Sequence, residues 1–264
     1  MEFEMTSPSN LDPSAGRKEE PLASTHILSS YDDELNKLEA LVLEMGGLVE
    51  FQLVNAVQAM MKSDVDLAST VISGDSRINN LEAEVNALAI RVLALRQPVA
   101  EDLRAIVMTL RIAGHLERMG DYAKNIARRA NTINKNQSFY GSLSTLGRMA
   151  DLVERHIKMA LDAYTNRDSD AAEHVRSEDE KVDLLHNSLF RELLTYMMED
   201  PAHIGAAMHL LFIAKNIERM GDHSVSIAQE IIFLVTGSWP EDKRPKGDKT
   251  SRMIFTAEEL ADMK

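Results

Sequence analysis

The sequence contains no cysteine. A chain without thiols has no disulfide framework, no thiolate metal site and no cysteine nucleophile. Any metal ion that it binds must therefore be held by carboxylate, imidazole or amide groups. Ligands of these kinds suit Mg, Mn, Fe or Zn.

Positive charge and long apolar runs are also scarce. The formal net charge is −13, which argues against a nucleic-acid partner because phosphate backbones require a basic surface. The longest apolar runs, such as residues 208–214 and 231–235, are much shorter than the roughly 20 residues that cross a bilayer. Residues 1–25 lack the apolar segment of a secretory signal. We therefore expect a cytoplasmic protein without direct membrane insertion.

Signatures of catalysis are missing as well. The sequence has no phosphate-binding glycine loop, nucleophile elbow or Ser/His/Asp arrangement. Di-iron bundles of the ferritin type need a Glu-x-x-His motif on each of two helices, and no such pair is present, although Asp183-Leu-Leu-His186 has a related spacing. The other histidines are scattered and are most simply satisfied polar residues. We predict no catalytic residues and do not expect an enzyme.

What the sequence does contain is an internal duplication. The pentapeptide Glu-Arg-Met-Gly-Asp at residues 117–121 returns 101 positions later, at residues 218–222. Earlier in the chain, Leu-Val-Glu at residues 48–50 returns 104 positions later, at residues 152–154. The fall in offset means that the second copy has lost three residues between these regions. The chain is therefore a tandem duplication with a period of about 100 residues, longer than that of most solenoid repeats.

Both copies carry apolar residues with the 3.6-residue period of amphipathic helices. Each copy is predicted to form three helices joined by short turns, which favours an antiparallel bundle. We therefore predict an all-α fold of two tandem antiparallel three-helix bundles related by pseudo-twofold symmetry. The expected divisions are a disordered arm over residues 1–28, the first repeat over 29–137, the second over 138–237, and a polar basic tail with a short terminal helix over 238–264.

Several boundaries follow from capping residues, glycine and proline. Expected features are a first helix from about residue 30 with a weak point at Gly46-Gly47, a capping box of Ser63 and Asp66, a stop before Pro98, a third helix over about 99–134, and a last long helix from Asp200-Pro201 to Gly237. The basic tail could fold back on the acidic body or meet an acidic partner, but we expect it to be flexible and solvated.

Paired carboxylates are the strongest candidate site. Glu117 and Asp121 are four residues apart, so they lie one turn apart on one helix face, and Glu218 and Asp222 repeat the pair. The second helix of each repeat adds a similar pair, Asp75 with Asn79 and Asp179 with Asp183. Adjacent helices in a bundle are about 8–10 Å apart. The two pairs of each repeat could therefore converge on one site, although a helical wheel places Glu117 and Asp121 away from the main apolar stripe.

Two interpretations of these acids remain open. A solvated acidic face is supported by Arg118, which lies three residues before Asp121 and could pair with it. Metal binding is supported by the intact pentapeptide, because flanking positions such as Gly114 and Lys215 have diverged. The pentapeptide glycine costs roughly 1 kcal/mol inside a helix relative to alanine, so its retention indicates a close approach. Clustered carboxylates suit hard divalent ions or a multinuclear iron or zinc group.

The motifs together resemble the PhoU family of phosphate-signalling regulators. The resemblance covers about residues 30–236 and rests on Leu95-Arg-Gln-Pro-Val-Ala-x-Asp-Leu-Arg104 and on both pentapeptides with their flanks, including Asn125-Ile-Ala127 and Ile227-Ala228. It implies two three-helix bundles whose E(D)-x-x-x-D motifs hold metal clusters. By position, the implied ligand pairs are Asp75 with Asn79, Glu117 with Asp121, Asp179 with Asp183, and Glu218 with Asp222. Asn79 departs from the acidic pattern, so the first site should bind metal more weakly or hold fewer ions.

The resemblance also implies a function. Members of this family restrain the phosphate-specific transporter and keep the sensor histidine kinase of the phosphate regulon from signalling when phosphate is plentiful. We therefore expect a negative regulator that is an adaptor between the kinase and the ATPase subunit of the transporter, and a homodimer. The alternatives are a metal-carboxylate enzyme or metal store, and an accessory to a low-affinity phosphate transporter.

Overall fold

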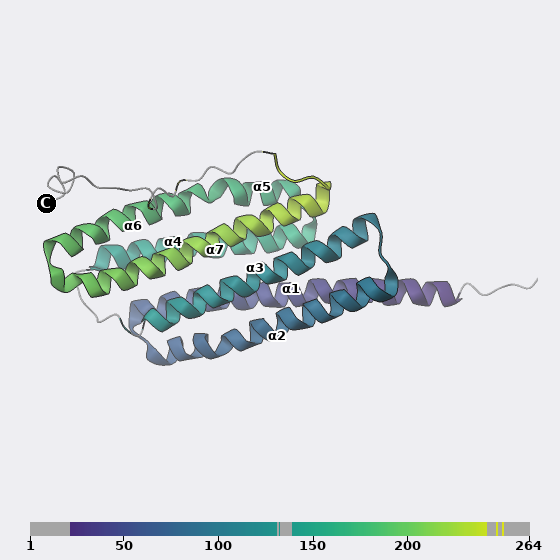
Figure 1. Ribbon diagram of the computed structural model, residues 1–264, viewed down its shortest axis with the longest axis horizontal. Helices are drawn as coiled ribbons and strands as arrows, with labels where there is room; N and C mark the ends of the chain where they lie inside the picture. The colour runs from purple at the N-terminus through teal and green to yellow at the C-terminus, as the bar shows by residue number, and fades with distance from the viewer. Residues whose placement is uncertain (1–21, 131, 133–138, 242–246, 248–249, 251–264) are drawn as a thin grey trace, which may run out of the picture.

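The computed structural model describes residues 22–130, 132, 139–241, 247 and 250, and its regular elements in these residues are all helices (Figure 1). The first repeat contains α1 (Leu22–Lys62), α2 (Val65–Arg96) and α3 (Ala100–Ala130). The second contains α4 (Tyr140–Asn166), α5 (Ser169–Glu178), α6 (Glu180–Glu199), the short 3₁₀ helix η2 (Pro201–His203) and α7 (Ile204–Thr236). The predicted all-α class and the duplicated bundle are confirmed.

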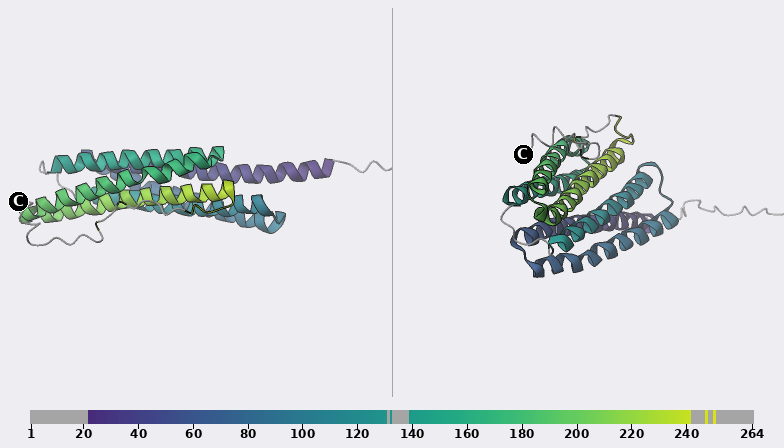
Figure 2. Two further views of the ribbon diagram at one scale, coloured as in Figure 1. Left: turned by 90° about the horizontal axis from the view of Figure 1, so that it is seen from above. Right: turned by 60° about the vertical axis from the view of Figure 1, so that its left-hand side comes forward.

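The two bundles lie side by side along their length (Figure 2). Within each repeat all three helical layers contact one another, with α5 and α6 together taking the place of α2. Between the repeats, α1 packs against its equivalent α4, and α3 packs against its equivalent α7. The helices α2, α5 and α6 are therefore on the outside, and the pentapeptide helices α3 and α7 are adjacent. Each repeat thus contacts the other through equivalent helices.

The contact between α1 and α4 explains one of the two glycines in the middle of α1. A Cβ atom on Gly46 would lie 2.4 Å from Cδ1 of Leu161 in α4, whereas Gly47 faces open space. The helix continues through both residues. Gly46 is therefore not the weak point that the sequence suggested, because its missing side chain lets the two repeats approach closely.

Helix ends follow the sequence with some differences. Asp200 caps the turn with Pro201 in its first position, and α7 ends at Gly237 with φ of 73°, both as expected. The expected capping box of Ser63 and Asp66 is wrong, because Asp64 is the N-cap and its Oδ1 accepts from the Leu67 amide at 2.9 Å. Asp168, which lies 104 positions after Asp64, caps α5 in the same way.

The third helix is shorter than expected and the first is longer. The helix α3 ends at Ala130, and the Thr132 hydroxyl donates to the Arg129 carbonyl at 2.7 Å. Such a bond from a threonine side chain competes with continued helix formation. Residues 22–28, which we assigned to a disordered arm, belong to α1, since no proline or glycine interrupts the sequence between Pro21 and Gly46. Most of the predicted arm, and the predicted terminal helix, lie outside the described residues.

Two features of the second repeat were not foreseen. The helix equivalent to α2 is divided at Asp179, where the Val182 amide bonds to the Asp179 carbonyl at 3.0 Å in a tighter turn. The tail also contacts the bundle, because Trp239 stacks on Phe233 with ring centroids 4.5 Å apart. Trp239 remains 44% exposed, so at this residue the tail is solvated as expected but is held against the bundle.

Between Ser30 and Lys62, the helix α1 is long and apolar enough to cross a membrane by length and composition alone. Half of its most apolar window is buried inside the protein, and Val42, Met45 and Val49 are fully inaccessible. The core helix of a bundle satisfies the same criterion, so this feature is weak support for a membrane span.

Candidate functional site

The first acidic cluster is built where α2 crosses α3, and it consists of Asp75, Glu82, Glu117 and Asp121. Asp75 projects from α2 towards the pentapeptide and is almost completely buried. A Cβ atom on Gly120 would lie 2.9 Å from Cδ1 of Ile78 and 3.6 Å from Oδ1 of Asp75. The pentapeptide glycine therefore lets α2 and the Asp75 carboxylate come close to α3, as its retention suggested.

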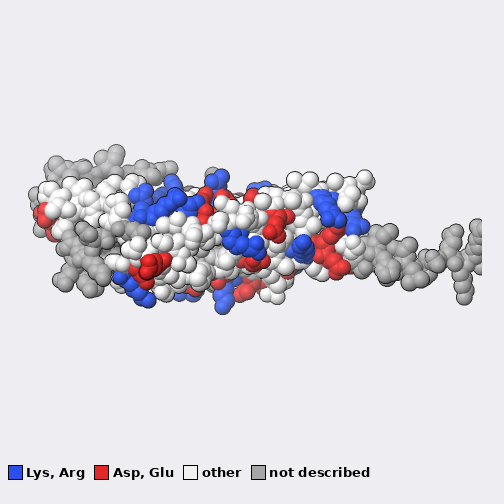
Figure 3. All heavy atoms as spheres, turned by 90° about the horizontal axis from the view of Figure 1, so that it is seen from below, with Lys and Arg blue, Asp and Glu red and all other residues white. Residues whose placement is uncertain are grey.

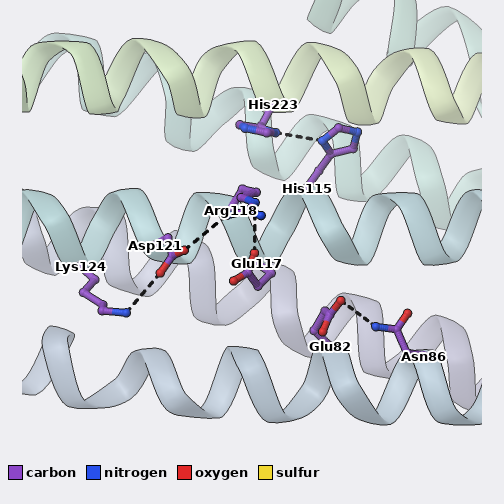
Figure 4. A network of polar contacts seen from close by, with 8 residues as sticks. All are labelled: Glu82, Asn86, His115, Glu117, Arg118, Asp121, Lys124 and His223. Carbon is purple, nitrogen blue, oxygen red and sulfur yellow. Dashed lines mark hydrogen bonds and ion pairs between the residues drawn. The ribbon is translucent and has the colours of Figure 1, made fainter.

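Basic side chains from α3 enter this cluster (Figure 4). The Lys124 ammonium donates to Asp75 Oδ2 at 2.6 Å and to Asp121 Oδ1 at 3.2 Å. The hydrogen bond to Asp75, more than any other influence, raises the pKa of Lys124. Arg118 lies within 3.6 Å of Glu117 and 3.9 Å of Asp121, so the local ion pairs expected for a solvated face are present too.

Negative charge nevertheless remains concentrated here. Burial, and then the neighbouring Asp121 carboxylate, raise the pKa of Glu117, with smaller contributions from Glu82 and Asp75, while Arg118 lowers it. The other three carboxylates are thus close enough to Glu117 to destabilise its ionised form. Glu82, which also accepts a hydrogen bond from Asn86 at 2.7 Å, belongs to the cluster although the sequence did not single it out as a ligand.

Asn79 is the exception among the predicted residues of the first repeat. It lies one turn beyond Asp75 on α2 and is exposed to solvent. The structure therefore brings Asp75, Glu117 and Asp121 together and leaves Asn79 on the surface.

The second acidic cluster repeats this plan between α7 and the junction of α5 with α6. A Cβ atom on Gly221 would lie 2.9 Å from Oδ1 of Asp179, so Asp179 occupies the place that Asp75 has in the first cluster. Asp179 and Asp183 are each 1% exposed and Glu218 is 4% exposed, while Asp222 is half-buried. Glu218 accepts from the Lys215 ammonium at 2.9 Å. Three of the four acids of the second cluster are thus buried, whereas Glu117 and Asp121, which the helical wheel placed off the apolar stripe, are half-buried.

Asp183 already has a partner from the tail. The Gly247 amide donates to Asp183 Oδ2 at 2.8 Å, and the Gly247 carbonyl accepts from the Asn187 side chain at 2.6 Å. A Cβ atom on Gly247 would lie 2.9 Å from Cβ of Asp183, so a larger residue would not fit. One of the predicted metal ligands is therefore covered by the chain itself.

Whether these clusters fit a metal ion depends on how their carboxylates are arranged and on which carboxylate oxygens lack a partner. Among the residues that the structure describes, no three Asp, Glu or His side chains are arranged to hold an ion as they stand. Oδ1 of Asp75, however, is buried without a hydrogen-bond partner, and a buried carboxylate oxygen calls for a donor or a cation. The donor set of the first cluster therefore fits a hard cation, provided that the side chains rearrange.

A histidine pair joins the two pentapeptide helices (Figure 4). His115 Nδ1 and His223 Nδ1 are 2.9 Å apart, and Arg111 bonds to the buried Glu230 on the same seam at 2.8 Å. Burial, and then the proximity of His115, lower the pKa of His223 to about 4. We treated these histidines as scattered, and nothing in their sequence spacing shows that they meet, because they belong to different repeats.

One side of the surface can be compared with the net charge of −13. On the side seen in Figure 3, Lys and Arg side chains lie among Asp and Glu side chains. The excess negative charge is thus partly held in the two clusters between helices, where the sequence-based picture of a freely solvated acidic face does not apply.

The PhoU domain, compared with this chain, matches residues 42–130 and again residues 146–231. The two matches begin 104 positions apart and end 101 positions apart, which are the offsets of the internal repeat.

Similar proteins cover nearly the whole chain. The phosphate-specific transport system accessory protein PhoU homolog of Rhizobium meliloti is 43% identical over 88% of this chain and 98% of its own length. The phosphate-specific transport system accessory protein PhoU of Escherichia coli K12 is 36% identical over 87% and 94% respectively. The crystal structure of PhoU from Pseudomonas aeruginosa, 36% identical, matches 79% of this chain and all of that chain with a TM-score of 0.74. With the domain matched twice and relatives 36–43% identical over 87–88% of its length, this chain belongs to the PhoU family.

Proposed function

We propose that this protein is an accessory regulator of phosphate transport. It restrains phosphate uptake and phosphate-starvation signalling as a cytoplasmic adaptor. It acts without turnover, by contact with the ATPase subunit of the transporter and with the sensor histidine kinase. The observation that carries the proposal is the match of both repeats, over nearly the full length, to proteins named as phosphate-specific transport system accessory proteins. That name describes an accessory protein and so favours a binding role over an enzymatic one.

The metal-binding part of the proposal assigns divalent or multinuclear ions to the two clusters. The ligands would be Asp75, Glu117 and Asp121 with Asn79 nearby in the first, and Asp179, Asp183, Glu218 and Asp222 in the second. The unpartnered buried oxygen of Asp75 and the crowding that raises the pKa of Glu117 support this assignment. A bound ion would neutralise the carboxylates and offer open coordination positions to a partner.

A metal-carboxylate enzyme or metal store gains no support from the cavities. A cavity of about 420 Å³ lies between α1 and α4 and is lined by residues such as Val57, Met61 and Gly147. None of the cluster residues lines it.

The regulatory role can be tested in a bacterium that lacks its own copy of this chain. Phosphate uptake and a phosphate-starvation reporter would be measured in phosphate-rich medium after complementation. The wild-type chain should keep the reporter off, and the double variant Glu218→Ala with Asp222→Ala should release it. The matched control changes two exposed acids outside the clusters, Glu84→Ala with Glu101→Ala, and should behave as wild type.

Two outcomes would contradict the proposal in different ways. A reporter that stays on with the wild-type chain would remove the regulatory role altogether. Full repression by the cluster variant would leave the regulatory role intact and show that this role does not need the acidic clusters. Co-purification of the kinase and of the transporter ATPase with tagged chain, and light scattering for the homodimer, would test the partners directly.

A further inference from the structure

Lys124 is the cation that bridges the two helices of the first cluster. Its ammonium lies between carboxylates from two helices, 2.6 Å from Oδ2 of Asp75 on α2 and 3.2 Å from Oδ1 of Asp121 on α3. The Lys124 side chain is 20% exposed and that of Asp75 is 5% exposed, so this contact is largely shielded from water. A shielded ion pair is screened much less than one on the surface.

The second repeat has no lysine at the position equivalent to Lys124. The position 101 residues after Lys124 is Val225, which is buried and apolar. The second cluster receives a lysine from the other side of its pentapeptide, since Lys215 precedes Glu218 by three residues and bonds to it. The position equivalent to Lys215 in the first repeat is Gly114. Each cluster has therefore acquired its own ammonium group, from opposite ends of the same motif.

An ammonium group and a divalent ion compete for the same carboxylate oxygens. Oxygen ligands bind such ions at about 2.0–2.6 Å, so an ion placed between Asp75 Oδ2 and Asp121 Oδ1 would take the position of the ammonium, and the two positive charges would repel each other. Lys124 does not saturate the cluster, because Oδ1 of Asp75 remains without a hydrogen-bond partner. The Lys124 side chain is flexible and 20% exposed, so its ammonium group can move from the cluster into solvent.

We propose that Lys124 is a resident counter-cation of the first cluster, which a divalent ion must displace in order to bind. The inference rests on the metal binding assigned under the proposed function. It makes the first cluster selective for ions that outcompete a tethered ammonium. It also couples binding to the release of a positive side chain onto the face beside α3, where a partner could read it.

The wild-type protein offers a direct test. Lysine acylation would be followed residue by residue with mass spectrometry, with and without Mn²⁺, while electron paramagnetic resonance counts the bound ions. Lys124 should react slowly without Mn²⁺ and several-fold faster with it, whereas the exposed Lys62 should not change. Bound Mn²⁺ with unchanged reactivity at Lys124 would overturn the inference and leave the metal assignment intact.

Variants give an independent test. Lys124→Met keeps the aliphatic stem and removes the charge, whereas the control Lys124→Arg keeps the charge. With the second cluster neutralised by Glu218→Gln and Asp222→Asn, Mn²⁺ should bind at least tenfold more tightly to Lys124→Met than to either the lysine or the arginine form. Equal affinities would overturn the inference alone. No Mn²⁺ binding by any of the three forms, or by the wild-type chain, would overturn both the inference and the metal assignment.

Discussion

The two acidic clusters share one frame and differ in what surrounds it. In both, a carboxylate on the second helical layer fits against the pentapeptide glycine, Asp75 at Gly120 and Asp179 at Gly221. The first cluster is partly open and has exposed Asn79 at its edge, whereas the second is buried and Gly247 covers its Asp183. After the duplication, both repeats kept the contact between carboxylate and glycine that sets the distance between the helices. The basic residues that pair with the carboxylates, and the exposure of each cluster to solvent, became different in the two repeats.

The largest expected effect concerns two buried residues that occupy equivalent positions in the two repeats and lie outside the clusters. His156 is 2% exposed, and burial above all lowers its pKa from 6.5 to about 4. The equivalent residue 104 positions earlier is Gln52, which is also buried and does not titrate. Between pH 6.5 and 4 the unfolded chain binds more protons than the folded one, so the free energy of unfolding falls as the pH falls.

The variant His156→Gln should lose less unfolding free energy than the wild type between pH 6.5 and pH 4. It gives the second repeat the non-titrating residue that the first repeat has at the equivalent position. The full shift corresponds to about 3 kcal/mol, measured as the difference in urea unfolding between pH 6.5 and pH 4. The His174→Gln variant, at an exposed position, provides the control. An identical pH dependence of wild type and His156→Gln would sink this prediction.

The next effect separates the two pentapeptide glycines. Gly221→Ala brings a methyl group within 2.9 Å of the buried Asp179 carboxylate, whereas Gly120→Ala meets the terminal methyl group of Ile78, which can rotate away. Overpacking costs about 1–3 kcal/mol, and alanine returns about 1 kcal/mol of helix propensity. Gly221→Ala should therefore lower the free energy of unfolding by up to about 2 kcal/mol, while Gly120→Ala changes it little. Equal losses in urea denaturation would show that the two contacts are equally rigid.

A smaller change should make the first cluster more like the second. Asn79→Asp restores the acidic pattern and should strengthen Mn²⁺ binding by up to about tenfold, or about 1.4 kcal/mol. The adjacent exposed Asn80 allows a matched control, since Asn80→Asp adds the same charge off the stripe. Titration calorimetry that finds the same gain for both variants would mean that net charge alone matters.

The smallest effect on stability concerns the tail. Gly247→Val would clash with Cβ of Asp183 and remove the two hydrogen bonds that cover the second cluster. Although Gly247 is buried, we expect a change in unfolding free energy within about 0.5 kcal/mol, because water can replace both hydrogen bonds once the contact is lost. Trypsin cleavage at the flanking Lys246 and Lys249 should nevertheless become faster. Unchanged cleavage would indicate that this contact does not hold the tail.

Much of the fold could be predicted from the sequence because it depends on local signals. The repeat offsets, the stop before Pro98 and the end of α7 at Gly237 follow from identity, proline and glycine, which act on their own neighbourhood. Gly120 was also informative, since a retained helix glycine indicated a close approach. These signals sufficed for two bundles and for the convergence of Asp75 with the pentapeptide.

The rest depends on contacts between elements far apart in the sequence. A helical wheel ranks Glu218 by its own helix and cannot show that a neighbouring helix buries it. His115 and His223 meet because α3 lies along α7, and Asp183 is covered because Gly247 returns to it. Lys124 had a sequence signal that we did not use, since it lies three residues after Asp121 and is therefore a helical neighbour of it.

The pairing of α1 with α4 and of α3 with α7 has a mechanical consequence. The two halves pack against each other along two pairs of long helices, so these contacts alone join one half to the other over an extended surface. Two halves produced as separate chains should therefore associate along the same helices. A pull applied to either end would be shared by the whole seam.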